Sequence, residues 1–236
     1  MTDLDGTTTT TTTTTLHDLD DSGRAVIRLG VVVGTTRPGR KAAAVAQWVQ
    51  HAASAHPQVQ PGRVELRLLD LAEVALPLLD EPVAAAFGQY QQPHTRAWAA
   101  TVADCDGFLF VTPEYNHSIP AALKNAIDYL FAEWHHKAAG IVSYGLAGGV
   151  RAAEHLRTVL LEVKTVSVSP QVALSVFEDF TYADITDPAS PFEVTVRDHQ
   201  VPALLEMLDD VLSYTSALAT LRTPHPEGST AALSDA

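Results

Sequence analysis

The chain has 236 residues, which is long enough to bury one sizeable hydrophobic core. Its 15 Lys and Arg stand against 28 Asp and Glu, and the formal net charge of -13 excludes nucleic acid as a general partner, because a duplex would be repelled. Apolar residues make up 46% of the chain, as in a soluble globular protein, but no apolar run reaches the roughly 18 residues that a membrane span needs.

The cysteine content and the first residues bear on the compartment. Cys105 is the one cysteine, so no internal disulfide can form, and we expect it to be a buried small side chain rather than a nucleophile. The chain does not begin with a basic segment followed by an apolar one, as a secretory signal does. The cytoplasm is therefore the expected location.

Composition divides the chain into three parts. Residues 1–24 hold a threonine run followed by an acidic cluster, which cannot bury enough apolar surface to offset the entropy of ordering. This pattern predicts a disordered segment, and residues 223–236 are expected to form a flexible tail. A single folded domain is expected over residues 25–222.

Strand and helix patterns alternate within that domain. The stretch "AVIRLGVVVG" (25–34) is β-branched and almost wholly apolar, as is typical of a strand buried on both faces. Four later stretches are also predicted to be strands: 63–71, 107–113, 138–145 and 165–170. Apolar residues at helical spacing predict helices over 41–55, 94–105, 119–131, 148–162 and 198–221. An irregular connection is expected over about 171–196.

Five strands that alternate with helices predict parallel pairing with right-handed crossovers. The expected fold class is α/β, a single-domain three-layer sandwich of flavodoxin-like type with a five-stranded parallel sheet. In such sheets a ligand binds beyond the carboxyl ends of the strands, near the switch point in strand order. The loops after the first, third and fourth strands should therefore carry the function.

The first of these loops, "GTTRPGRKAA" (34–43), concentrates positive charge in an acidic protein. Arg37, Arg40 and Lys41 stand where a buried strand passes into a helix, although basic residues oppose the dipole at a helix N-terminus. Unpaired N–H groups at that point already favour an anion, and Arg37 can bind a phosphate with two donors. No Ser or Thr follows a Lys as a triphosphate loop requires, so a single phosphate is expected. The alternative is a set of solvated charges at a helix end.

The other two loops add polar and glycine-rich segments. "PEYNHSIP" (113–120) is a polar turn bracketed by two prolines, which suits a flat heterocycle but is also compatible with an ordinary turn before a helix. "SYGLAGG" (143–149) would let backbone N–H groups approach a ligand, although alone it is a weak signal. His135 and His136 have no third candidate ligand nearby, so no metal site is predicted.

These stretches together make the chain resemble the NAD(P)H-dependent FMN reductase family of flavodoxin-like quinone, chromate and azo-dye reductases. The resemblance spans about 27–170. "GTTRPGR" is similar to the family's phosphate loop, "PEYNHSIPAALKNAID" to its P-E-Y-N signature and following helix, and "SYGLAGG" to its glycine loop. In one departure, many members have Ser and Asn where this chain has Arg40 and Ala42, although some relatives carry R-P-G-R.

The resemblance implies a set of cofactor-binding residues. Thr35 and Arg37 would hold the FMN phosphate, with Arg40 as a further contact. The residues expected to line the isoalloxazine ring system are Pro113, Glu114, Tyr115, Asn116, Ser143, Tyr144 and Gly145. Because the flavin itself carries the redox chemistry, no catalytic side chain is assigned.

The implied activity is an FMN-dependent NAD(P)H oxidoreductase. Hydride would pass from NADPH or NADH through FMN to flavin, quinone or a similar small acceptor. The family also implies homodimers or homotetramers, to which the segment 81–95 could contribute a subunit contact. Two alternatives are a flavodoxin-like electron carrier without nicotinamide-dependent activity, and a regulatory protein that has lost FMN.

Overall fold

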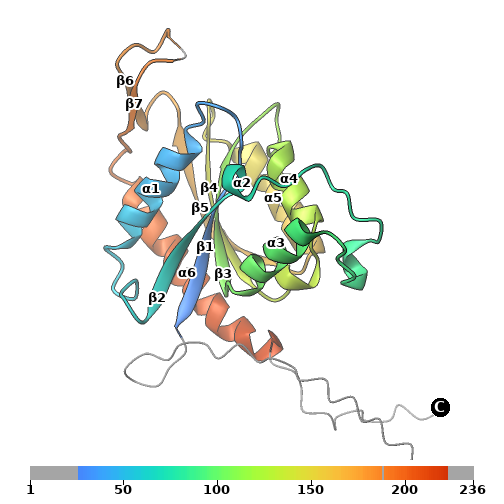
Figure 1. The fold of residues 1–236 in the computed structure, drawn as a ribbon. Helices are drawn as coiled ribbons and strands as arrows, with labels where there is room; N and C mark the ends of the chain where they lie inside the picture. The colour runs from blue at the N-terminus through green and yellow to red at the C-terminus, as the bar shows by residue number, and fades with distance from the viewer. Residues whose placement is uncertain (1–25, 188, 223–236) are drawn as a thin grey trace, which may run out of the picture.

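The computed structural model describes residues 26–187 and 189–222 (Figure 1). The segments predicted to be disordered or flexible, 1–24 and 223–236, lie outside the described residues. Within the described ranges, none of the helices combines the length and the hydropathy that a bilayer crossing requires.

The five expected strands form one parallel sheet in the order β2-β1-β3-β4-β5 (Figure 1). Their bounds are β1 Ile27–Val33, β2 Val64–Asp70, β3 Gly107–Pro113, β4 Ala138–Gly145 and β5 Val166–Ser175. The chain leaves β1 for β2 on one side and then crosses to β3 on the other. The switch point in strand order therefore lies between β1 and β3, which confirms the flavodoxin-like fold class.

Helices cover both faces of the sheet and make it the middle of three layers (Figure 1). Their bounds are α1 Ala42–Ala53, α2 Leu71–Val74, α3 Pro93–Ala103, α4 Ala121–Asp128, α5 Val150–Glu162 and α6 Gln200–Arg222, with 3₁₀ turns η1 Ala85–Phe87 and η2 Ala132–Trp134. One core packs α1 and α6 on the sheet, and the other packs α3, α4 and α5. Val31 and Val33 enter the first core while Val32 enters the second, so β1 is buried on both faces as its sequence predicts.

The structure corrects the prediction of an irregular connection over 171–196. β5 continues to Ser175, and an antiparallel hairpin of β6 (Phe180–Tyr182) and β7 (Phe192–Val194) follows it. The predicted strand, 165–170, ends at Pro170. The pairing with β4 instead passes from Ala139–Ser167 to Ile141–Gln171, and this irregularity accommodates the proline. An edge strand tolerates the proline because one side of β5 has no ladder partner among the described strands.

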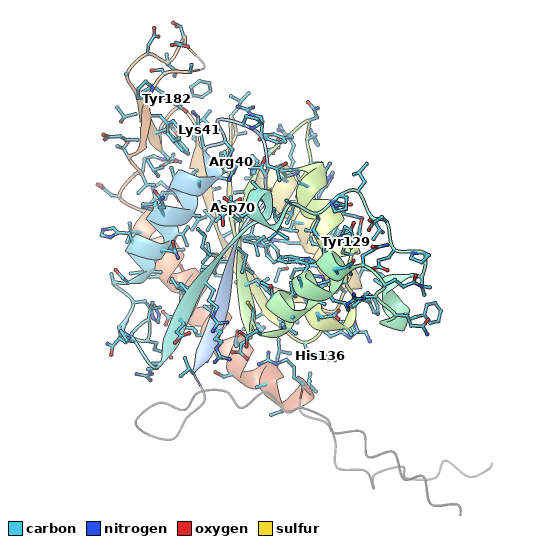
Figure 2. The ribbon with its side chains drawn as sticks, in the orientation of Figure 1. Arg40, Lys41, Asp70, Tyr129, His136 and Tyr182 are labelled. Carbon is cyan, nitrogen blue, oxygen red and sulfur yellow. The ribbon has the colours of Figure 1, made fainter. Side chains whose placement is uncertain are left out.

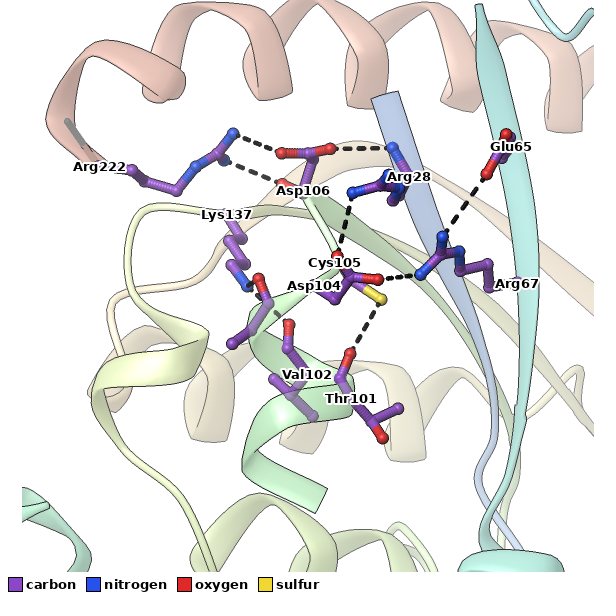
Figure 3. Close-up of polar contacts among 11 residues, drawn as sticks. Arg28, Glu65, Arg67, Thr101, Val102, Asp104, Cys105, Asp106, Lys137 and Arg222 are labelled. Carbon is purple, nitrogen blue, oxygen red and sulfur yellow. Dashed lines mark hydrogen bonds and ion pairs between the residues drawn. The ribbon is translucent and has the colours of Figure 1, made fainter. Parts of the chain in front are cut away.

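A polar network ties the amino ends of the strands to the end of α6 (Figure 3). The Asp106 carboxylate accepts hydrogen bonds from the Arg28 amide at 2.9 Å and from Arg222 Nη2 at 3.1 Å. The Lys137 ammonium is buried and donates to the carbonyl of Val102, at the end of α3, at 2.7 Å. These contacts lie at the amino ends of the strands, away from the three loops at the carboxyl ends. They stabilise the fold and take no part in the site.

Lys137 predicts a specific dependence of stability on pH. Burial lowers the pKa of its ammonium to about 8, whereas an unfolded lysine titrates near about 10.4. Between these values the unfolded chain binds more protons, so stability rises with pH over this window. Lys137→Met lacks this group. We therefore expect the unfolding free energy of the wild type, measured relative to that of Lys137→Met, to rise by about 1–3 kcal/mol from pH 8 to pH 10.5. Urea unfolding at both pH values measures it. The exposed Lys124→Met variant is the control, and parallel profiles for the wild type and Lys137→Met would contradict the assignment.

Candidate functional site

The three loops singled out by the sequence meet at one edge of the sheet. They follow β1, β3 and β4, which are neighbours in the strand order, so their carboxyl ends lie side by side. A pocket opens between them. It is lined from the first loop by Arg37, Arg40 and Lys41, from the second by Pro113, Glu114 and Tyr115, and from the third by Tyr144, Gly145 and Leu146, with Val176 beyond β5.

The first loop is joined to the second through Thr35. The Thr35 side chain is buried, and its hydroxyl forms a 3.0 Å hydrogen bond with the Tyr115 hydroxyl. The Arg37 amide approaches the same Thr35 oxygen at 3.4 Å, and the Arg37 guanidinium carbon lies 5.9 Å from the centre of the Tyr115 ring. The aromatic residue of the second loop therefore stands against the basic part of the first.

Arg40 reaches across to the end of β2 (Figure 2). Its Nη2 donates to Asp70 Oδ2 at 2.5 Å, and the other carboxylate oxygen of Asp70 accepts from the Ala72 amide in the first turn of α2. The Arg40 charge is thus balanced by a fixed carboxylate. Its buried Nε has no hydrogen-bond partner among the described residues. A buried N–H without a partner is costly, and an anionic ligand could satisfy it.

The start of α1 is open in a similar way. Lys41 is the N-cap residue, its own side chain makes no capping hydrogen bond, and the first turn of α1 contains no acidic residue. The first N–H groups of a helix carry a partial positive charge and need acceptors. Arg37 and Lys41 form no ion pair with a carboxylate within 26–187 and 189–222, so the charges at this end of the helix have no fixed counterion there. The arrangement suits a phosphate.

The second loop folds back on itself in a tight turn. The amides and carbonyls of Tyr115 and Ser118 exchange hydrogen bonds of 2.9 and 3.1 Å. Asn116 and His117 between them have positive φ values of 48° and 76°, which is the backbone of a type I′ turn. Asparagine tolerates this conformation better than most residues, so the turn itself gives a structural reason for Asn116.

Glu114 binds the N-terminus of α5. Its carboxylate accepts from the Arg151 amide at 3.1 Å and from Arg151 Nη1 at 2.7 Å. Burial alone would raise the pKa of this carboxyl, but the hydrogen bonds and the charge of Arg151 hold it below its ordinary value. The side chain therefore fastens the second loop to the third, and the amide of Glu114 also donates to the Tyr144 carbonyl at 3.0 Å.

The third loop depends on its glycines. Gly148 and Gly149 have φ values of 72° and 71°. The buried Ser143 hydroxyl donates to the Gly148 carbonyl at 2.7 Å, so that this side chain shapes the loop. The Tyr144 ring is buried beside Phe180 of the hairpin, and burial raises the pKa of its hydroxyl. Gly145 and the exposed Leu146 line the pocket.

Proteins with similar sequences show which family this chain belongs to. A sequence model of the NADPH-dependent FMN reductase family matches residues 27–179. The chain belongs to this family. An NAD(P)H-dependent FMN reductase of Schizosaccharomyces pombe is 37% identical over 164 residues, which cover 69% of this chain and 80% of that one. Another, of Saccharomyces cerevisiae, is 36% identical over 144 residues, covering 58% and 75% of the two chains.

A solved structure agrees on the fold. The flavoenzyme NAD(P)H:(acceptor) oxidoreductase FerB of Paracoccus denitrificans superposes with a TM-score of 0.59 at 24% identity, over 81% of this chain and 98% of that chain. As a member of the FMN reductase family, the chain is an oxidoreductase that uses FMN as its cofactor and NAD(P)H as its co-substrate.

The residues present fit FMN. The phosphate end has what a phosphate monoester needs: the uncapped start of α1, the unpartnered Arg40 Nε, and two cations without a carboxylate partner in the described part of the chain. Of the ten predicted cofactor-binding residues, seven line the pocket, and the other three, Thr35, Asn116 and Ser143, belong to the same loops without lining it. Sequence reasoning did not find Val176 or the hairpin, because neither carries a recognisable motif.

Proposed function

We propose that the chain transfers hydride equivalents from NADPH or NADH to a small acceptor such as a quinone or a free flavin, with FMN held in the pocket between the three loops. The observation that carries this proposal is the convergence on one pocket of a basic loop, whose Arg37 and Lys41 have no carboxylate partner among the described residues, a rigid aromatic turn and a glycine loop. Relatives support the acceptor class, since a quinone reductase of Escherichia coli is 37% identical over 113 residues, covering 44% of this chain and 57% of that one.

The side chains of this site would bind and orient. Thr35, Arg37 and Arg40 would hold the phosphate, and Pro113 with the 114–116 turn would border the ring system. Gly145 and Tyr144 would present backbone groups to the other part of the isoalloxazine ring system. Ser143 would keep the glycine loop in place through its hydrogen bond to the Gly148 carbonyl. Bound FMN would supply the hydride acceptor at its N5 atom, so that no side chain of the protein needs to act as an acid or base.

We further propose that the protein works as a homodimer or homotetramer in the cytoplasm. Leu146, which lines the pocket, and Phe177, which follows the lining residue Val176 in the chain, are 73% and 62% exposed, and a second subunit would cover these apolar side chains. The one cysteine, Cys105, is buried and burial raises the pKa of its thiol to about 11, which suits a reducing compartment where no disulfide is needed.

Anaerobic addition of NADPH or NADH to the FMN-loaded protein tests the function. Rapid loss of the visible flavin absorbance, restored on addition of a quinone, is the expected result. A protein that binds FMN but is not reduced by either nucleotide would instead be an electron carrier, the alternative that the named relatives do not favour. A protein that stays colourless after incubation with FMN would overturn the proposal altogether.

A further inference from the structure

Lys41 lies against the aromatic face of the β6–β7 hairpin. Figure 2 shows Lys41 near Tyr182. The Lys41 ammonium nitrogen is 4.8 Å from the centre of the Tyr182 ring and 3.9 Å from the centre of the Phe192 ring. At these distances the negative faces of both rings attract the cation, and the attraction grows as water is excluded. The same lysine begins α1 and lines the pocket. The hairpin therefore fixes where one charge of the phosphate site stands.

The hairpin is itself firmly attached at its base. The Asp179 carboxylate is fully enclosed and accepts hydrogen bonds from the Ser175 amide at 2.8 Å, from the Arg197 amide at 2.9 Å and from Arg197 Nη2 at 2.8 Å. Residues on both sides of the hairpin are thus held to one carboxylate. The family match ends at residue 179, so the strands that carry Tyr182 and Phe192 lie beyond it.

The charge of a phosphate group indicates different roles for Arg37, Arg40 and Lys41. A phosphate monoester carries about -1.5 to -2 charges at neutral pH. Arg40 is already neutralised by Asp70, which leaves Arg37 and Lys41 as the two charges at this pocket without a carboxylate partner among the described residues. Burial lowers the pKa of the Lys41 ammonium, and repulsion from Arg37 lowers it further. A dianion between them would relieve that repulsion.

We propose that Lys41 supplies the second positive charge of the FMN phosphate site, and that Phe192 and Tyr182 position it. The inference rests on the proposed function. Arg40 then contributes a hydrogen bond and a tie to β2, while the net charge that matches the phosphate comes from Arg37 and Lys41. The hairpin becomes a positioning element for the cofactor, and loss of a ring should weaken FMN binding through Lys41 alone.

Titration of the flavin-free full-length protein with FMN and with riboflavin, which lacks the phosphate, tests this proposal. Lys41→Met is expected to weaken FMN binding about 10- to 100-fold, the scale of one charge-assisted hydrogen bond, and to leave riboflavin binding unchanged. Lys41→Gln is a second variant should Met disturb the helix start. Phe192→Leu should lose several-fold in FMN affinity and Phe192→Tyr should restore it. The double variant Lys41→Met/Phe192→Leu should be no weaker than Lys41→Met.

The controls make each outcome decisive. Arg63→Met also removes one positive charge but lies before β2, at the opposite edge of the sheet, and should leave both affinities unchanged. If the wild type prefers FMN over riboflavin and the Lys41 variants keep that preference in full, the inference fails while the proposed function stands. If Phe192→Leu tightens FMN binding, the rings hold Lys41 away from the phosphate and the positioning role fails. A wild type that binds neither flavin overturns both.

Discussion

Replacement of Arg37 by alanine is expected to weaken FMN binding by about 10- to 100-fold, or about 1.5–3 kcal/mol, which is the range for a hydrogen bond to a charged group. Arg37 follows the buried Thr35 in the first loop, lies beside the Tyr115 ring and has no carboxylate partner among the described residues. Its guanidinium is therefore free to bind two phosphate oxygens, which lysine could not match in geometry. Fluorescence titration of the flavin-free protein with FMN measures the loss.

Three comparisons decide whether this loss comes from the phosphate. Riboflavin affinity should be unchanged in Arg37→Ala, because the neutral flavin presents no anion to this side chain. FMN affinity of the wild type should fall more steeply with salt than that of the variant, since one fewer charge is engaged. Arg63→Ala at the far edge of the sheet should bind FMN like the wild type. Equal losses for FMN and riboflavin would show that Arg37 shapes the loop and does not hold the phosphate.

Replacement of Gly149 by alanine should lower the free energy of unfolding by about 2–4 kcal/mol and should also weaken FMN binding. Gly149 has a φ of 71°, and an added Cβ would lie 2.8 Å from both the amide nitrogen and the carbonyl oxygen of Tyr144. These are backbone atoms of the buried strand β4 and cannot move aside easily. The glycine loop must therefore shift, and it borders the pocket. Urea unfolding and FMN titration measure the two effects.

Gly62→Ala is a matched control for this prediction. Gly62 also has a positive φ, 77°, but an added Cβ there would meet nothing within 4 Å. Its cost should be confined to the backbone conformation, about 1 kcal/mol, with FMN affinity unchanged. If the two alanine variants unfold at the same urea concentration, the close approach to Tyr144 carries no energetic weight. The third loop would then owe its shape to other contacts.

Much of the fold could be read from the sequence because its strands are nearly continuous apolar runs. The stretch 25–34 reads as a strand buried on both faces, and β1 indeed sends alternate valines into the two cores. The extent of β5 was missed, because Pro170 resembles a strand end and only the edge position makes it tolerable. The hairpin was missed too, since its strands are too short to show a period.

The sequence also determined which loops matter. A basic loop after the first strand, a polar turn after the third and a glycine loop after the fourth must meet once the sheet is parallel and of flavodoxin-like order, because the carboxyl ends of neighbouring strands share one edge. That reasoning, together with the P-E-Y-N stretch beginning at Pro113, predicted the family and its cofactor. The motifs are local patterns that a sequence carries directly, whereas the strand order entered through the expected flavodoxin-like fold and was confirmed by the structure.

Only the tertiary structure decided how the charges of the site are divided. Arg40 meets Asp70 and Glu114 meets Arg151 across 30 and 37 residues, and no local pattern pairs them. Lys41 meets rings that come more than a hundred residues later, on a hairpin that the sequence did not reveal. Electrostatic partners depend on distances of a few ångströms between distant segments, and the packed fold alone sets those distances.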